Sequence, residues 1–229
     1  MSFGNAAETE ILDLLFRNEN FANVGDATGL RGATTSGSLY IALHTADVGE
    51  AGDQTTNEIS YTGYARVGVI RATSGWTLSG DQISNTSAVT FGQRSDVGTS
   101  VASHFSAGLV SSGASLALIK GPLGTSLQGA FTGATNDNVT IPGHTLSVDD
   151  RVAFFPVLGS SLPTGITEGT LYWVKTSATD VITVSTTQGG ATQDITAVGD
   201  GIAIKATTLS ITQNVTPEFA AGVLVARLD

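Results

Sequence analysis

The sequence predicts an all-β protein, a β-sandwich or jelly-roll-like domain with one N-terminal helix. Residues 39–44 alternate apolar and other side chains with period two, as in a strand with one buried face. Short apolar stretches recur along the chain, separated by Gly-, Ser-, Asn- and Pro-containing turns. The 229 residues include 28 glycines, and only 13% of them are charged, a composition that favours strands and turns over surface helices.

The N-terminal segment is expected to form one helix, Ala6 to Arg17, with Asn5 and Glu8 as a capping box. Its apolar face consists of candidate interface residues, Ile11, Leu14 and Leu15, widened by Leu12 and Phe16. This face either packs on the chain's own sheet or docks on a neighbouring subunit. Residues 18–38 read as an extended loop.

A hairpin follows, with a strand at 39–44, an acidic connection, and a return strand that begins near Val67. The connection carries four carboxylates, those of Asp47, Glu50, Asp53 and Glu58. The return passes through Tyr61, Tyr64 and Arg66, which have the aromatic and arginine character of interface anchors. The alternative is that the tyrosines cap the domain's own core with their hydroxyls in water.

Further short strands are expected along the rest of the chain, without a second helical pattern between them. The expected segments lie at 67–72, 76–78, 82–91, 101–109, 116–119, 151–155, 170–175 and 181–185, with the last strand or strands within 211–228. In the strand at 170–175, Tyr172 and Trp173 alternate faces, so one belongs to the core and the other is available at the surface.

Composition limits the function classes. The net charge of −10 argues against nucleic acid or an anionic membrane as a partner. Cysteine is absent, which excludes disulfides and thiolate metal sites. No apolar run approaches the roughly 18 residues of a membrane-spanning helix, and the N-terminus lacks the features of a signal peptide. The protein is therefore expected to be made and used without export.

The sequence contains no pattern that specifies catalysis or a cofactor. The acidic connection could bind Ca²⁺, but it lacks EF-hand spacing, and a solvated turn is favoured. The three histidines, His44, His104 and His144, form no close pair at ligand spacing, which favours structural roles. Nucleophile-elbow, Walker and dinucleotide-binding glycine patterns are absent. We therefore expect no catalytic, cofactor-binding or metal-binding residues and no enzymatic activity.

Two stretches resemble known phage proteins. The hairpin, with LYIALHTAD, GEAG, QTTNE and YTGYARV in order, resembles a family of tailed-bacteriophage virion proteins often labelled tail fibre or decoration proteins. The segments GHTLSVDDRVAF, LPTGITEGTLYWV and DVITVSTTQGGA resemble a small β module inserted in many phage tail and virion proteins. The resemblance implies a parent β-sandwich virion domain at 1–129 plus 207–229, with an inserted small β domain at 130–206.

The resemblance implies a structural virion protein. The favoured role is a capsid decoration (cement) protein that bridges major capsid protein subunits on the outer surface of the head, together with copies of itself, as in a trimer. The alternative is a tail-fibre or tail-tip component whose inserted module binds a host surface glycan, with Tyr172 or Trp173 as the stacking residue. A polysaccharide-degrading tail enzyme is the rival from another class, and it requires a carboxylate pair in a groove.

Overall fold

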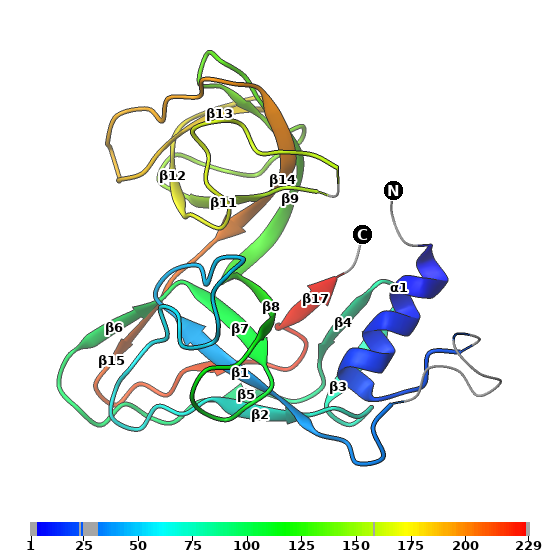
Figure 1. Ribbon diagram of the computed structural model, residues 1–229. Helices are drawn as coiled ribbons and strands as arrows, with labels where there is room; N and C mark the ends of the chain where they lie inside the picture. The colour runs from blue at the N-terminus through cyan, green and yellow to red at the C-terminus, as the bar shows by residue number, and fades with distance from the viewer. Residues whose placement is uncertain (1–3, 23, 25–31, 158, 228–229) are drawn as a thin grey trace.

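A computed structural model describes residues 4–22, 24, 32–157 and 159–227. The chain forms two bodies, a lower base and an upper barrel, joined by a narrow waist (Figure 1). We use "the base" for the N-terminal helical segment with strands β1–β8 and β15–β17, and "the barrel" for strands β9–β14. The structure confirms an all-β chain with one N-terminal helix and several antiparallel sheets. A jelly-roll strand order remains a prediction.

The N-terminal helix α1 spans Asn5–Leu12 and continues as one π-helical turn, η1 (Asp13–Arg17), which ends at Asn18 with φ 61°. The N-cap is Gly4, and no side chain caps the helix, so the predicted Asn5–Glu8 capping box is wrong. Leu12 and Phe16 are the buried residues of the apolar face, and the Phe16 ring meets the Trp76 ring edge to face at 4.7 Å. None of the described helices is long and apolar enough to span a bilayer.

The central sheet of the base has four antiparallel strands in the order β2-β1-β7-β8. They are β1 (Ser38–His44), β2 (Val67–Ile70), β7 (His104–Gly108) and β8 (Ala117–Pro122). The pairing of β1 with β2 confirms the predicted hairpin. Leu39, Ile41 and Leu43 of β1 are fully buried in the core, as the period-two pattern predicts. Ala42 and His44, which alternate with them, are fully buried too, so the end of β1 is covered on both faces.

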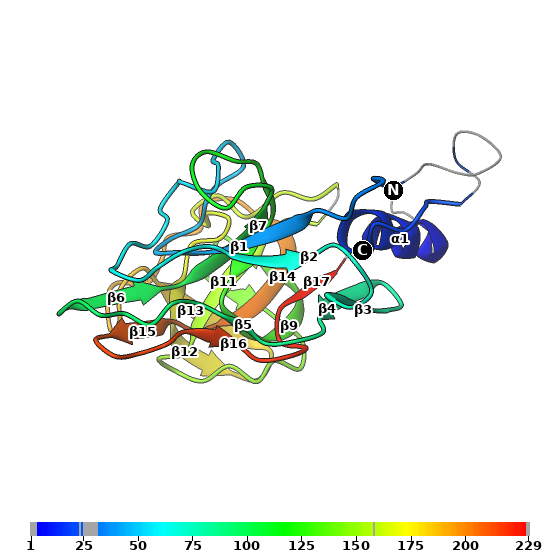
Figure 2. The same cartoon turned by 90° about the horizontal axis from the view of Figure 1, so that it is seen from below.

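The C-terminal segment completes three small antiparallel sheets of the base. β15 (Leu209–Thr212) pairs with β6 (Thr99–Ala102), and β16 (Glu218–Phe219) pairs with β5 (Val89–Thr90). β17 (Val225–Arg227) joins β4 (Gln82–Asn85), which also pairs with β3 (Trp76–Ser79). α1 and β17 lie at one end of the base, and β6 and β15 lie at the other (Figure 2).

The barrel is closed by six strands in the order β10-β13-β12-β11-β14-β9. Its strands are β9 (Gly124–Gly133), β10 (Val139–Thr140), β11 (Arg151–Phe155), β12 (Tyr172–Ala178), β13 (Val181–Ser185) and β14 (Gly199–Ala206). The predicted strands at 151–155 and 181–185 are confirmed, and the predicted strand at 170–175 begins at Tyr172 and extends to Ala178. The domain boundary predicted at residue 130 falls inside β9.

Each body has its own hydrophobic core. The barrel core contains Phe131, Phe154 and Tyr172, whose rings form a chain with centroid distances of 4.8 and 6.0 Å. The base core runs from Phe16 and Trp76 through Ile41. Closure leaves the barrel without free sheet edges, so the barrel buries its apolar face without help from the base.

Replacement Phe154→Ala is expected to destabilise the barrel by about 3–5 kcal/mol, because it removes a fully buried ring from a closed core. Segment-resolved hydrogen exchange should show faster exchange in β9–β14 and unchanged protection in β1 and β7. Val198→Ala is the matched control, since Val198 is 72% exposed. Equal loss of protection in both bodies would show that the two cores unfold as one unit.

Candidate functional site

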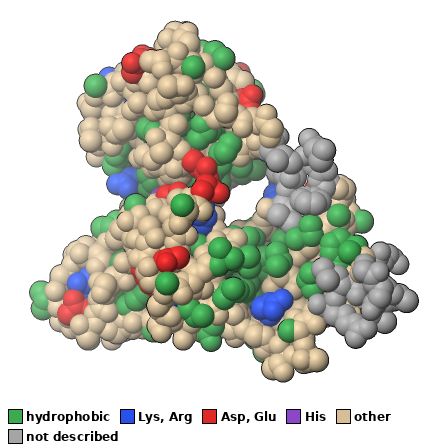
Figure 3. Space-filling model, viewed as in Figure 1, with side chains coloured by type: hydrophobic (Ala, Val, Ile, Leu, Met, Phe, Trp, Pro, Cys, Tyr) green, Lys and Arg blue, Asp and Glu red, His purple; other side chains and the backbone are tan. Residues whose placement is uncertain are grey.

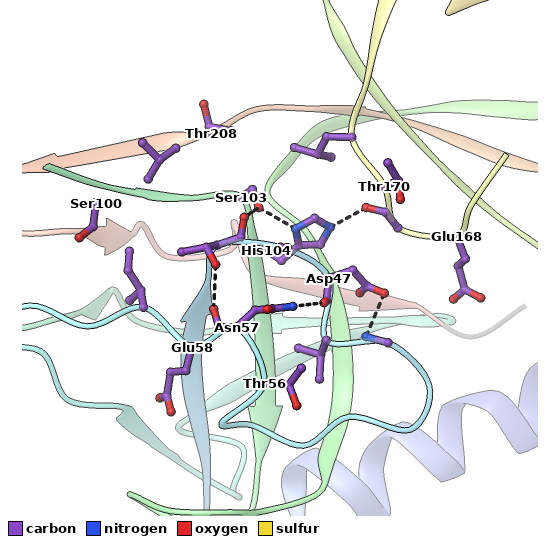
Figure 4. Close-up of a pocket in the computed structure, with 18 of the residues that line it drawn as sticks. Asp47, Thr56, Asn57, Glu58, Ser100, Ser103, His104, Glu168, Thr170 and Thr208 are labelled. Carbon is purple, nitrogen blue, oxygen red and sulfur yellow. Dashed lines mark hydrogen bonds between the residues drawn. The ribbon is translucent and has the colours of Figure 1, made fainter. Parts of the chain in front are cut away.

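A cleft of about 1040 Å³ lies between the base and the barrel. It is lined by the acidic connection (45–50 and 56–60), by residues 99–104 at β6 and the start of β7, and by the barrel loop 167–171 (Figure 4). Arg151 and Thr208 complete the lining on the barrel side. This cleft is therefore built jointly by both bodies.

The acidic connection is held to the base by a buried ion pair. Arg66 donates from Nε to Glu58 Oε1 and from Nη2 to Glu58 Oε2, both at 2.7 Å. The Arg66 side chain is 2% exposed and that of Glu58 is 18% exposed. The hydrogen bond from Arg66 to Glu58 raises the pKa of the guanidinium against the opposing effect of burial. This bidentate geometry makes both groups structural anchors of the loop.

The tyrosines predicted as interface anchors also belong to the interior. The Tyr64 hydroxyl accepts a hydrogen bond from Leu43 N at 3.0 Å and donates to Glu58 Oε1 at 3.1 Å, and burial raises the pKa of Tyr64. The Tyr61 hydroxyl donates to Gly92 O at 2.9 Å, and burial raises its pKa as well. Tyr61, Tyr64 and Arg66 are therefore not available as an exposed interface. All three precede β2.

Two buried histidines connect the walls of the cleft. His44 Nδ1 lies 2.9 Å from Thr56 O, and its Nε2 lies 2.8 Å from Ser106 Oγ. His104 Nδ1 lies 2.8 Å from Ser103 Oγ, and its Nε2 lies 2.8 Å from the carbonyl oxygen of Gly169 in the barrel loop. A carbonyl can only accept, so His104 donates from Nε2. Burial lowers the pKa of both rings, and both are neutral structural groups.

Gly169 must be glycine where the barrel loop meets the acidic connection. Its φ is +68°, and a Cβ there would lie 2.6 Å from Asp47 Cγ. Its backbone N–H donates to Phe154 O at 3.2 Å, while its carbonyl accepts from His104. One residue thus contacts the barrel strand, the base and the acidic connection together.

Lys120 of β8 adds an electrostatic contact at the same place. Its Nζ lies 2.9 Å from Glu50, 3.4 Å from Asp47 and 3.4 Å from Glu168 of the barrel loop. Burial by itself would lower the pKa of Lys120, but the hydrogen bond with Glu50 and the attraction of Asp47 and Glu168 outweigh it and raise the pKa. Lys120 therefore stays charged and links the two bodies.

The carboxylates of the acidic connection are engaged by protein groups. Asp53 Oδ1 accepts from the backbone and the hydroxyl of Thr55, and these hydrogen bonds lower the pKa of Asp53. Glu58 is paired with Arg66, and Asp47 accepts from Gly49 N at 3.0 Å. Among the described residues there is no cluster of three acidic or histidine side chains that could hold a metal ion.

The two aromatic candidates of the barrel, Tyr172 and Trp173, lie on opposite faces of β12. Tyr172 is 2% exposed and lies in the barrel core, and its hydroxyl accepts from Thr167 N at 2.9 Å, so its expected role in surface binding is wrong. Trp173 is half-buried on the outer side, with the Arg151 guanidinium 4.3 Å from its ring centre. Sequence reasoning missed Arg151, whose neighbour across the sheet only the register reveals.

The helix residues named as interface candidates differ in whether they pack against the base core. Leu15 packs against the base core, whereas Ile11 and Leu14 are half-buried outside the core cluster. The face that the helix turns to the core is formed by Leu12 and Phe16. Packing on the chain's own sheet therefore accounts for the inner side of the helix, and Ile11 and Leu14 remain candidate contacts for another subunit.

Residues 2–149 match the model of a protein family described as "Podophage GP4 fiber I protein gp80". The match covers more than half of the 229 residues. The chain belongs to this family. The chain is accordingly a structural protein of a bacteriophage virion. The match ends at residue 149, so it includes the base through β8 and the first two barrel strands, β9 and β10. No curated protein matches the chain.

Replacement Glu58→Gln is expected to lower the free energy of unfolding by about 3 kcal/mol, because it leaves the Arg66 charge buried without its partner. Denaturant titration measures the change. The double replacement Glu58→Gln with Arg66→Met should recover part of this loss. Asp81→Asn is the control, as it breaks the more exposed pair of Asp81 with Arg227 and should cost under about 1 kcal/mol. A Glu58→Gln loss no larger than that of the control would contradict the anchoring role.

Acidification below a pH of about 6.5 is expected to destabilise the fold, because the unfolded chain takes up protons on His44 and His104 before the folded chain does. Each buried ring contributes a slope of up to about 1.4 kcal/mol per pH unit between its unfolded and folded pKa values. His104→Gln can keep a donor for Gly169 O but cannot titrate, so it should flatten the profile between pH 7 and 5. His144→Gln is the control, since it leaves both buried rings in place. Equal slopes in wild type and His104→Gln would contradict this role.

Proposed function

We propose that this chain is a component of a virion fibre, in which the base assembles with other subunits and the barrel contacts the host surface. The observation that carries the proposal is membership of a family described as a fibre protein. The barrel also has its own core and stands clear of the base above a narrow waist (Figure 3). A module placed in this way can meet a cell surface without disturbing the assembled base.

The assembly contacts we propose are to copies of the same chain. Ile11 and Leu14 of the helical segment are half-buried apolar residues outside the base core. Leu109 and Leu116, at the connection between β7 and β8, are 52% and 59% exposed. Exposed apolar side chains of this kind are typical of surfaces that become covered in an assembly. The negative net charge favours neither nucleic acid nor an anionic membrane as the partner.

The proposed role is binding without catalysis. The carboxylates that line the cleft carry structural contacts, Glu58 with Arg66, and Asp47 and Glu168 with Lys120. A glycosidase needs two carboxyl groups that converge on a scissile bond, one of them with a raised pKa. Of the described carboxyl groups, Asp13 has its pKa raised, through burial beside Arg17 at the helix, away from the cleft.

Immunogold labelling of intact virions with an antibody to this chain tests the proposed location. Gold confined to the fibres or tail is the expected result. Gold spread over the head would overturn the fibre assignment and favour capsid decoration, with the major capsid protein as the partner. An antibody to the major capsid protein serves as the positive control for the head.

A further inference from the structure

The pairing of β11 with β12 and β14 brings a cation and an indole ring together at the waist. Arg151 lies opposite Trp173 of β12 on one side and opposite Ala206 of β14 on the other. Its guanidinium carbon lies 4.3 Å from the centre of the Trp173 ring. This cation–π contact restricts the rotamers of the Arg151 side chain, which reduces the conformational entropy lost when a ligand binds the guanidinium.

Within the described part of the chain, the guanidinium of Arg151 contacts the Trp173 ring but has no ion pair and no hydrogen bond. Among the described arginines, Arg17, Arg66, Arg71, Arg94 and Arg227 each make an ion pair or hydrogen bonds with their side chains. The Arg151 side chain makes neither with any described residue. Its five N–H donors are therefore available in a geometry that fits the two oxygens of a carboxylate.

A hollow of about 250 Å³ lies beside this pair, with a volume equal to roughly eight water molecules. Arg151 and Trp173 line it together with three threonines of the waist, Thr125, Thr207 and Thr208. Arg151 and Thr208 also line the larger cleft between the bodies. The two hollows thus share Arg151 and Thr208 as lining residues.

The charges around the hollow indicate the chemistry of the ligand. Lys205 and Asp150 pair at 2.6 Å, so these two charges largely neutralise each other. Asp149 lines the same hollow with an exposed carboxylate. That carboxylate disfavours a ligand that is anionic throughout, such as a bare phosphate or sulfate. A ligand whose single carboxylate lies at Arg151 can instead present hydroxyl groups to Asp149, which accepts their hydrogen bonds. A ligand with both a carboxylate and hydroxyls matches Arg151, Asp149 and the threonines.

We propose that Arg151, Trp173 and the hollow beside them form a binding site for a carboxylate-bearing sugar of a surface polysaccharide. The carboxylate pairs with the Arg151 guanidinium, and the sugar hydroxyls bond to Asp149 and the waist threonines. Trp173 acts by holding the guanidinium in place, instead of offering an open ring face for stacking. This assignment rests on the proposed role of the barrel in contacting the host surface.

Titration calorimetry with the full chain tests the site, using a panel of oligouronates and their carboxyl-reduced, neutral counterparts. A uronate should bind and its reduced counterpart should not. Arg151→Lys keeps the positive charge but loses the paired N–H donors of the guanidinium that bind both carboxylate oxygens. This replacement should weaken binding at least about tenfold. Trp173→Ala should weaken it as well. Lys175→Met is the control for loss of a positive charge elsewhere on the barrel, since Lys175 lies on the same strand outside the hollow, and the affinity of this variant should match that of wild type.

Three results would overturn the site. These are no binding by any oligouronate, equal binding of the reduced counterparts, or equal loss in Lys175→Met and Arg151→Lys. Inorganic phosphate that competes at the affinity of the uronate would reduce the site to a general anion site and also contradict the proposal. Hydrogen exchange of each variant confirms that the barrel is folded.

The outcome is separable from that of the immunogold experiment. Uronate binding by a chain located on the head would contradict the fibre assignment and leave the site standing. A chain located on the fibres that binds no uronate would contradict the site alone.

Discussion

The antiparallel pairing of β9 with β14 is the constraint on which the rest of the structure depends. It closes the barrel, and it returns the chain to the point where it left the base. Thr207 N donates to Leu123 O at 2.6 Å, and Leu123 N donates to Ser103 O at 2.7 Å. The chain therefore leaves the base and re-enters it at neighbouring residues, Leu123 and Thr207. From there the C-terminal segment can reach β4, β5 and β6 and complete their sheets. A long excursion between two such adjacent points adds little to the entropy of loop closure.

The waist is held by polar contacts of different kinds. His104 donates to Gly169 O, Lys120 reaches Glu168, and Gly169 lies close against Asp47. Such contacts are directional and satisfied on both sides, so they set the orientation of the barrel without a large apolar interface. The charged groups gather near the waist (Figure 3), where solvent still reaches several of them.

Polar side chains of the acidic connection that appear from the sequence to form a functional surface make hydrogen bonds inside the base instead. The carboxylates look solvated in the sequence, yet Glu58 accepts from both Arg66 and Tyr64. Gln54 is fully buried and bonds to Tyr40 O and Ser106 Oγ. A loop with these buried polar groups is stable only when each one has a partner, and the sheet formed by β1 and β7 supplies those partners.

Several elements could be predicted from local sequence alone, including the strands at 151–155 and 181–185, the β1–β2 hairpin and the N-terminal helix. These depend on local periodicity and turn residues, which act over a few positions. The tertiary structure was needed to place the side chains. Tyr61, Tyr64 and Arg66 became internal anchors because the connection before β2 folds against the base, where Glu58 and Gly92 O accept their hydrogen bonds. Arg151 came to lie on Trp173 because strand register joins residues that are far apart in the chain. Local patterns contain no information about that register, and so they cannot tell an unused guanidinium from a buried one.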